Sequence, residues 1–520
     1  MIFEGILPFV SHFLNNLMMQ ERKINGHAPD NVKTDDLYAK IAERIQDVLR
    51  ESNPDPNPEN ATILTFRGET FGEDGVQILA NYKLPKLDVL DLADMQIGSK
   101  GAEYLSQNST WVNLRELFLK GNQLKDEGVA SLAQNKSWSN LEIFGLMENE
   151  CGCDGIIAIA TNTIWKNLLQ LHLTSNHIGE EGAAKLAENN TWKNLEMLFL
   201  MNNKIGPVGA QKLSTNTSWV NLRMLTLSFN NLQDEGAAAL ATNESWINLQ
   251  SLELMGNDIG AEGAAKLALN TSWVNLKELN LVQNDIGAGA RGLAANTSWR
   301  NLEMLNLATT NLGEEGAVGL ASNTSWVNLR LLNLQQNAIG DQGLAAIASN
   351  RAWGDLRHLY LSKNNIKDIG AEMLGSNSHW TKLEELDLSE NQIEDKGIEK
   401  LGLNTSWGNL EVLMLTGNPF GDDGIAGLSK NRSWAKLGIL EFSDVIIGGK
   451  VFLELALNPF WPNLHSIEAP EDDLGPAAMK ALEVIRTRNL NMFGYSDDDY
   501  DDDGEGCEEL GEDDEDDDEA

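Results

Sequence analysis

The sequence predicts an α/β solenoid, an open curved array in which short parallel strands line the concave face and helices cover the convex face. Three observations predict this fold. The pattern N-x-S-W-x-N-L-x-x-L-x-L, found at Asn296 to Leu307, recurs along most of the 520-residue chain. Its tryptophans stand 27 residues apart, except for one spacing of 26 between Trp273 and Trp299. All 14 tryptophans of the chain occupy this one position. A fixed period of this length is the signature of a solenoid.

Each repeating unit opens with a short predicted strand. In the unit that starts at residue 222, Leu225 and Leu227 alternate with varied residues. A period of two indicates a strand whose leucines face inward. An asparagine follows at a fixed position, Asn230 in this unit, and we expect it to satisfy backbone groups of neighbouring units, as buried loops require. Three units lack this asparagine and carry instead Met95, Thr310 or Val445.

The second half of each unit predicts a helix. Its Asp-Glu-Gly-Ala-x-x-Leu-Ala pattern spaces the apolar residues at a helical period, and we expect its glycine and alanine where the helix approaches the strand layer. A second asparagine, Asn243 in the same unit, suits the left-handed conformation that ends many helices. The tryptophan then fills the return loop. Because strands stack about 4.8 Å apart whereas helices need about 8–10 Å, the helices belong on the longer, convex side.

The two ends of the chain depart from the repeat. We predict a helical N-terminal cap and linker over 1–60, with a short helix over 8–21 and a better one over 34–51; a small adaptor domain is the alternative. The solenoid covers 61–490, with about 14 full 27-residue repeats and divergent ends. An acidic tail over 491–520 is too charged to fold. Removing the 17 acids of its last 24 residues from the net charge of −39 leaves about −22 on the remaining chain.

Composition argues against several classes of partner and location. The acidic balance disfavours nucleic acid and anionic membranes and favours basic proteins. No run approaches the ~18 apolar residues that cross a bilayer. The apolar start of the chain carries Glu4 and lacks both a basic region and a cleavage site, so we interpret it as a packing segment. The three cysteines form no plausible disulfide framework, which fits a reducing compartment.

The repeat L-x-x-L-x-L-x-x-N-x-I-G-x-x-G-A-x-x-L-A resembles the leucine-rich-repeat family, and its strand-plus-helix unit is similar to the ribonuclease-inhibitor-like subtype. The resemblance covers about residues 61–490. It implies a leucine-rich-repeat horseshoe with parallel β-strands on the concave face and α-helices on the convex face. This fold carries many functions, so the resemblance by itself does not identify one.

The repeats provide an internal control for locating a binding site. Positions that hold one residue type in every unit serve the scaffold, whereas varied positions on the concave side are free to contact a partner. In the early units these positions hold aromatic and methionine side chains, which are typical of interface cores. Later units offer polar or acidic residues and one tyrosine. The predicted protein-binding residues are Phe118, Met147, Met197, Phe199, Met201, Met224, Phe229, Met255 and Tyr360.

The sequence offers little that indicates catalysis, and we predict no catalytic, cofactor or metal site. His172 and His358 lack a neighbouring nucleophile in matching positions, and Cys151 and Cys153 form a lone pair without further ligands. Phosphate-binding and dinucleotide-binding loops are absent from the sequence. Many loops read Asn-x-Ser/Thr, a formal glycosylation acceptor, and we interpret them as loop geometry copied by duplication.

We therefore expect a non-enzymatic, monomeric scaffold that binds a folded protein on its concave face. Two alternatives stay open. Glu441 to Asp444, followed by Gly448 to Val451, is similar to the arginine-bearing loop of the GTPase-activating proteins of the transport GTPase Ran, with Gly-Gly-Lys where that family has Gly-Arg. The acidic tail instead suggests a binder of histones or other basic proteins. We expect a cytoplasmic location; a nuclear one, or export to a host cell without a recognisable signal peptide, as for an effector, stays open.

Overall fold

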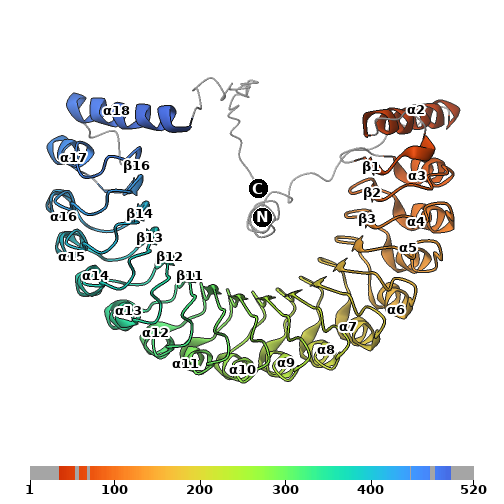
Figure 1. The fold of residues 1–520 in the computed structure, drawn as a ribbon, viewed down its shortest axis with the longest axis horizontal. Helices are drawn as coiled ribbons and strands as arrows, with labels where there is room; N and C mark the ends of the chain where they lie inside the picture. The colour runs from red at the N-terminus through yellow and green to blue at the C-terminus, as the bar shows by residue number, and fades with distance from the viewer. Residues whose placement is uncertain (1–33, 53–57, 67–70, 446, 469–474, 494–520) are drawn as a thin grey trace, which may run out of the picture.

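The chain forms an open horseshoe of strand-plus-helix units (Figure 1). The computed structural model describes residues 34–52, 58–66, 71–445, 447–468 and 475–493. Sixteen strands pair in parallel, in sequence order, in a single sheet that does not close on itself. The strands line the inner side of the curve and the helices lie outside (Figure 1). The predicted α/β solenoid horseshoe is therefore confirmed.

Every strand is three residues long. The strands are β1 (Ile63–Thr65), β2 (Val89–Asp91), β3 (Glu116–Phe118), β4 (Ile143–Gly145), β5 (Gln170–His172), β6 (Met197–Phe199), β7 (Met224–Thr226), β8 (Ser251–Glu253), β9 (Glu278–Asn280), β10 (Met304–Asn306), β11 (Leu331–Asn333), β12 (His358–Tyr360), β13 (Glu385–Asp387), β14 (Val412–Met414), β15 (Ile439–Glu441) and β16 (Ser466–Glu468).

A helix follows each strand, and two further helices, α2 and η1, precede β1. The helices are α2 (Thr34–Ser52), η1 (Pro58–Asn60), α3 (Gly72–Ala80), α4 (Gly98–Gln107), α5 (Lys125–Leu132), α6 (Cys153–Thr161), α7 (Gly179–Glu188), α8 (Gly206–Leu213), α9 (Gln233–Leu240), α10 (Ala261–Leu267), η2 (Gly287–Gly289), α11 (Ala290–Ala294), α12 (Gly313–Leu320), α13 (Gly340–Ser349), α14 (Asp368–Gly375), α15 (Asp395–Leu401), α16 (Asp422–Leu428), α17 (Gly449–Ala456) and α18 (Pro476–Phe493).

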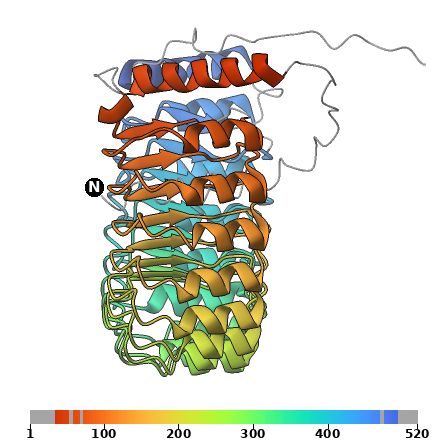
Figure 2. The same ribbon diagram turned by 90° about the vertical axis from the view of Figure 1, so that its right-hand side faces the viewer.

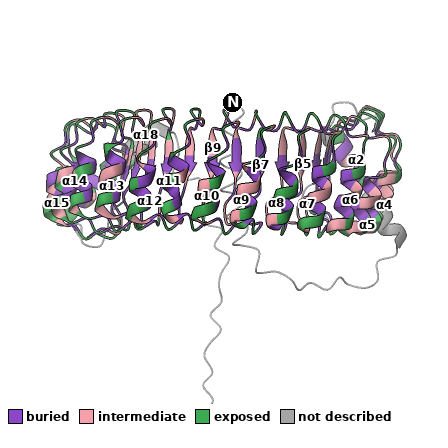
Figure 3. Ribbon diagram, turned by 90° about the horizontal axis from the view of Figure 1, so that it is seen from below, coloured by how far each residue is buried: buried purple, intermediate pink, exposed green. Residues whose placement is uncertain are grey.

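The core is one continuous apolar layer between the strands and the helices. The inward leucines of the strands, such as Leu225 and Leu227, have no accessible surface. All 14 tryptophans are also buried, at 0–1 % exposure. Thirteen of their indole N–H groups have no hydrogen-bond acceptor among the described residues, so these tryptophans act by packing. Exposed residues gather on the outer helices and the connecting loops, and the strands are largely buried (Figure 3).

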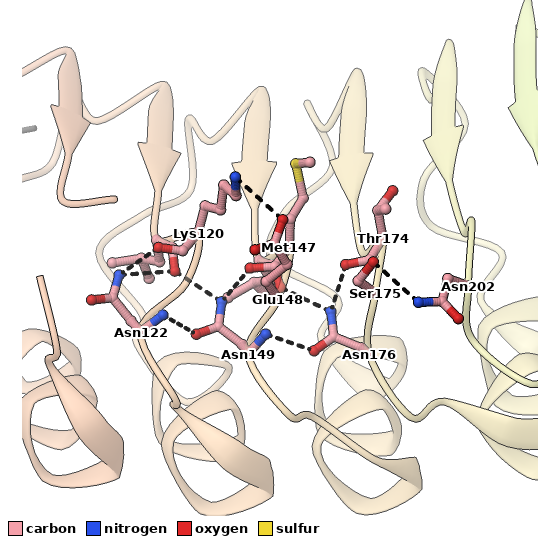
Figure 4. Close-up of polar contacts among 11 residues, drawn as sticks. Lys120, Asn122, Met147, Glu148, Asn149, Thr174, Ser175, Asn176 and Asn202 are labelled. Atoms are coloured by element: carbon pink, nitrogen blue, oxygen red, sulfur yellow. Dashed lines mark hydrogen bonds and ion pairs between the residues drawn. The ribbon is translucent and has the colours of Figure 1, made fainter. Parts of the chain in front are cut away.

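The first asparagine of each unit ties neighbouring units together, as predicted (Figure 4). The Asn149 amide nitrogen donates to Leu119 O of the preceding unit at 2.8 Å and to Met147 O of its own unit at 3.1 Å. Its side-chain oxygen accepts from the backbone N–H of Asn122 at 3.0 Å. Asn149 is fully buried. Its hydrogen bonds therefore take the place of water at backbone groups that have no partner in the β-sheet. We call this repeated series the asparagine ladder.

The second asparagine is not left-handed, and that prediction is wrong. Asn243 is absent from the positive-φ residues, and Asn189, its counterpart in an earlier unit, has φ −70° and ψ 119°. The Asn243 amide nitrogen donates to the carbonyls of Ser214 and Asn216 at 2.8 and 2.9 Å. Its oxygen accepts from the N–H groups of Ser245 and Trp246. This asparagine therefore forms a second inter-unit series that holds the tryptophan loop.

The helix glycines also have a different role from the predicted one. A Cβ on Gly209 would lie 2.6 Å from the Ile205 Cγ2 of its own unit, and 3.1 Å from the Ala183 Cβ and 3.3 Å from the Glu180 Cα of the preceding helix α7. The glycine therefore permits close approach between neighbouring helices, not approach to the strand layer. Several helices are further linked by an acid of the preceding unit. The Asp395 Oδ1 accepts from Gly421 N at 2.7 Å and Gly424 N at 2.9 Å, and thus caps α16.

Helices cover both ends of the array. Helix α2 packs against α3 and β1, and α18 packs against α17 and β16, so neither terminal unit leaves its core open there (Figure 2). The predicted helix over 34–51 corresponds to α2, and its Ile45 and Val48 are buried. The predicted helix over 8–21 lies outside the described residues. Of the predicted acidic tail over 491–520, residues 491–493 belong instead to α18, and residues 494–520 lie outside the described part of the chain. No described helix is both long enough and apolar enough to cross a membrane.

Candidate protein-binding surface

The register of the sheet brings the predicted aromatic residues of the early units into one row. Phe118, Gly145, His172 and Phe199 are consecutive partners across β3 to β6. A Cβ on Gly145 would lie 3.0 Å from the Phe118 ring, so that ring lies over the glycine. The rings of His172 and Phe199 are 4.3 Å apart. Burial lowers the pKa of His172 to about 4, so this row is uncharged at neutral pH.

A second group of apolar side chains lies at the carboxyl ends of the neighbouring strands. Met147, Met201 and Met255 are half-buried. The N–H of Phe229 donates to Met255 O at 2.7 Å, and the Phe229 ring lies over Gly256, where a Cβ would come within 2.5 Å of it. Phe229 remains 36 % exposed. The apolar concave patch, as we name it, comprises Phe118, Met147, Met197, Phe199, Met201, Phe229 and Met255.

Met224 does not belong to this patch, and its predicted exposure is wrong. It lies in register between Met197 of β6 and Ser251 of β8 and is only 7 % exposed. Strands about 4.8 Å apart crowd the long side chains of adjacent units, so one side chain is covered by its neighbours. The repeat pattern placed Met224 on the concave side, but only the packing of its neighbours sets its exposure.

The later strands carry a polar group around Tyr360. The Glu385 Oε2 accepts a hydrogen bond from Tyr360 OH at 2.9 Å and lies 3.1 Å from the Nδ1 of His358. The His358 hydrogen bond holds the pKa of Glu385 below its usual value. Asp387 is buried and its Oδ2 accepts from the Gln335 amide at 3.1 Å. Tyr360 is therefore fixed by bonds to its own scaffold and is not joined to the apolar concave patch.

Two carboxyl groups near the middle of the sheet and one near its end have raised pKa values. Burial raises the pKa of Glu253 to about 7, although Asn280 donates to its Oε2 at 2.7 Å. Burial also raises the pKa of Glu278. Near the end of the array, burial and then the charge of Glu468 raise the pKa of Glu441. The concave face thus changes from mostly apolar in β3–β8, where Glu116 and Glu253 are the strand carboxyl groups, to acidic in β12–β16.

Sequence reasoning missed a row of charged residues along the edge where the strands begin. Arg115 pairs with Asp88 and with Glu142, in the units on either side. Arg330 pairs with Glu303 at 2.7 Å in the same way. These side chains are 29–51 % exposed, so each pair adds at most about 1 kcal/mol. This row could have been predicted from the sequence, because residues of opposite charge occur at the same repeat position in adjacent units, 26 or 27 residues apart.

The predicted histidine, cysteine and lysine candidates do not form a metal-binding cluster in the part of the chain that the structure describes. No group of three or more His, Cys, Asp or Glu side chains could hold a metal ion there. Cys151 is buried, and burial raises the pKa of its thiol above the usual range. Lys450, in the segment similar to Ran-type activators, lies in the first turn of α17 on the helix side of the array and is 88 % exposed.

The Asn-x-Ser/Thr sites are part of the scaffold. Asn243 and Asn270, two typical members, are 2 % and 3 % exposed. The amide nitrogen that a glycan would occupy donates in Asn270 to Ala241 O and Asn243 O, both at 2.9 Å. A glycan cannot be attached there without breaking these bonds, which supports interpreting these sites as loop geometry.

Comparisons with known proteins agree with this geometry. A family model described as leucine-rich repeats in two copies matches residues 355–401. A model described as leucine-rich repeat matches six segments, at 112–133, 166–187, 220–241, 247–268, 327–348 and 409–429. No curated protein matches the chain. Neither the ribonuclease-inhibitor-like subtype nor the likeness to Ran-type activators is confirmed by these matches.

Three solved structures show a distant likeness to this chain. An internalin (InlF) of Listeria monocytogenes is 20 % identical with a TM-score of 0.45, over 84 % of this chain and 96 % of that one. A TDR receptor is 18 % identical with a TM-score of 0.42, over 81 % and 69 %. The functional domain of InlJ from Listeria monocytogenes is 16 % identical with a TM-score of 0.42, over 76 % and 74 %. By its sequence pattern, its strand-and-helix geometry and the family models that match it, the repeating unit of this chain is a leucine-rich repeat.

Proposed function

We propose that this protein is a non-enzymatic scaffold that binds a folded protein partner on the concave face of its horseshoe. Leucine-rich-repeat proteins generally serve as protein-interaction scaffolds, and solenoids present extended concave surfaces suited to this role. Sixteen strands about 4.8 Å apart give an inner surface on the order of 70 Å along the arc. That length suits a protein better than a small molecule.

One observation carries the proposal. The scaffold leucines are fully buried, whereas Phe199, Met201 and Phe229 remain partly accessible on neighbouring strands of the same face. Aromatic and methionine side chains grouped in this way are typical of the buried core of an interface. The uncharged His172 beside Phe199 keeps this group apolar at neutral pH.

The acidic half of the concave face favours a partner that is basic opposite β12–β16. Glu385 lies there on β13, and Glu441 and Glu468 lie on the adjacent strands β15 and β16. A cationic side chain of the partner would relieve the like-charge repulsion that contributes to the raised pKa of Glu441. The net charge of −39, tail included, would speed the encounter with a basic protein at low ionic strength.

The proposal is tested by affinity capture and mass spectrometry with the double variant Phe199→Glu and Met201→Glu. Two buried carboxylates in the interface should abolish capture of the specific partner, since uncompensated charges are costly to desolvate. The matched control is Val208→Glu with Val318→Glu. These valines are 46 % and 47 % exposed on the convex helices α8 and α12.

The control should recover the same partner as the wild-type chain. Circular dichroism and tryptophan fluorescence must show both variants folded. Recovery of the partner by the folded concave variant at wild-type levels would remove the apolar concave patch as the binding site. Loss of the partner with both variants would place the contact elsewhere on the molecule.

A further inference from the structure

One unit in the middle of the array is shorter than the others, and its helix is incomplete. The segment Ile259-Gly-Ala-Glu-Gly263 is matched in the next unit by Ile286-Gly-Ala-Gly289, which lacks one residue. The missing residue falls in the first turn of the helix. As a result a 3-10 turn, η2, precedes an α-helix of only 5 residues, α11. Its neighbours α10 and α12 have 7 and 8 residues.

The contact of η2 and α11 with the following helix α12 is made by glycines of α12. A Cβ on Gly316 would lie 2.6 Å from Gly287 O, and one on Gly319 would lie 2.7 Å from the Arg291 Cβ. The two helices therefore approach closely without interlocking side chains at these positions. Interlocking of side chains is what resists sliding between packed helices.

The asparagine ladder is also interrupted at this place. At the preceding interface, the Asn284 Oδ1 accepts from Asn257 N at 3.1 Å and Ile259 N at 2.9 Å, and its amide donates to Leu254 O at 2.9 Å. All three bonds join the β8 and β9 units. Asn284 and its partners thus define what an intact interface contains.

Thr310 occupies the asparagine-ladder position of the next unit. It makes none of the three corresponding hydrogen bonds to the preceding unit. Its hydroxyl has two acceptors within reach of its one hydrogen, Leu307 O at 2.6 Å in its own unit and the Asn337 Oδ1 at 3.0 Å in the following one. Within the described residues, the backbone N–H groups of Asn284 and Ile286 therefore have no side-chain acceptor across the interface. Met95 and Val445, the other two residues that replace the ladder asparagine, lie near the ends of the array. At the β5–β6 interface the Asn203 amide still donates to Leu173 O at 2.8 Å, although its side-chain oxygen accepts no hydrogen bond from the described residues.

We propose that the interface between the β9 and β10 units is a flexible seam about which two stiffer halves of the horseshoe reorient. In a solenoid each unit contacts only its neighbours, so the weakest interface is where the array opens first. The seam lies between the apolar half of the concave face, β3–β8, and its acidic half, β12–β16. A partner that contacts both halves would set the angle between them, but the seam itself does not depend on the proposed function.

Amide hydrogen exchange on the full chain tests the weakness of the seam. The amides of Asn284 and Ile286 should exchange at least about tenfold faster than those of Asn257 and Ile259, since a net hydrogen bond is worth about a factor of ten. Thr310→Asn should restore the three bonds and slow these amides by about the same factor.

The matched variant Asn337→Thr should create a second seam one unit later. It should speed exchange at Thr310 and Leu312, whose N–H groups now donate to the Asn337 Oδ1 at 2.9 and 3.1 Å. Both variants are first checked for wild-type circular dichroism. Equal protection across all interfaces of the wild-type chain, or no change at Asn284 and Ile286 in folded Thr310→Asn, would overturn the proposal.

Distance distributions between spin labels test the motion itself. Cysteines replace Glu181 and Gln342, six units apart across the seam, with Cys153 and Cys507 changed to serine. The control pair is Lys100 and Glu262, six units apart within one half; all four labelled positions are exposed and precede the helix glycine. The distribution should be broader across the seam and should narrow with Thr310→Asn. Distance distributions of equal width for the two pairs would overturn the proposed reorientation of the two halves, even if amide hydrogen exchange at the seam is fast.

Discussion

Replacing Asn230 by alanine should expose how much of the stability comes from the asparagine ladder. Its side-chain oxygen accepts from Asn203 N at 2.9 Å and Ile205 N at 3.2 Å. Its amide donates to Leu200 O at 2.8 Å and to Leu227 O at 2.9 Å. Asn230 is 1 % exposed, so water cannot easily replace these bonds. The substitution therefore leaves backbone groups without partners instead of exposing them to solvent.

The magnitude follows from the two N–H groups that lose their acceptor. A buried donor without a partner costs about 1–3 kcal/mol. Two such donors, with the weakened carbonyls, give a loss of about 3–5 kcal/mol in the free energy of unfolding. The control is Asn221→Ala, at the residue just before this unit, which removes one exposed bond from the amide to Lys193 O at 3.0 Å. An exposed bond of this kind should contribute at most about 1 kcal/mol.

Urea unfolding followed by tryptophan fluorescence measures the difference, because the tryptophans are buried along the whole array. An array of repeats can unfold in steps, so exchange at the Asn203 and Ile205 amides is measured as a local readout. Both amides should lose protection in Asn230→Ala and keep it in Asn221→Ala. Equal stabilities of the two variants, or unchanged protection at Asn203 and Ile205, would refute the assignment of the ladder as a main inter-unit link.

Two further predictions concern pH and modification. Because the folded-state pKa of Glu253 is raised from 4.5 to about 7, the folded chain binds more protons than the unfolded one between these values. Its stability should fall by at most about 3 kcal/mol from pH 4.5 to 8, and Glu253→Gln should flatten that part of a pH series of urea midpoints. The intact folded chain should stay unmodified at Asn243 when incubated with oligosaccharyltransferase and a lipid-linked glycan, because its amide is buried in two hydrogen bonds. A synthetic peptide of residues 238–252 should be modified; mass spectrometry that finds a glycan on the folded chain would contradict the buried geometry.

The regular part of this protein could be predicted from its repeats. A period of 27 residues, a two-residue alternation of leucines and an invariant tryptophan position define a solenoid with its strands inside, and each is a local pattern that every unit repeats. The asparagine ladder was predictable for the same reason, since a polar residue conserved among units beside buried leucines must bind backbone groups. For the proposed binding site, the two-residue alternation of the strands also predicted that Phe118 and Phe199 lie on the concave side.

Contacts between units depend on geometry that no single unit contains. The register of the sheet places the Phe118 ring over Gly145 and His172 beside Phe199, and the crowding of adjacent strands covers Met224. The left-handed conformation predicted for Asn243 is wrong because a helix-ending asparagine is locally compatible with more than one conformation, and the bonds to the preceding unit select one that is not left-handed. Thr310 was visible in the sequence as an irregular residue. The loss of three hydrogen bonds at its interface could not be predicted from the sequence. A hydrogen bond depends on distance and direction in space, so this loss is seen only when the backbone groups of the two adjacent units are placed.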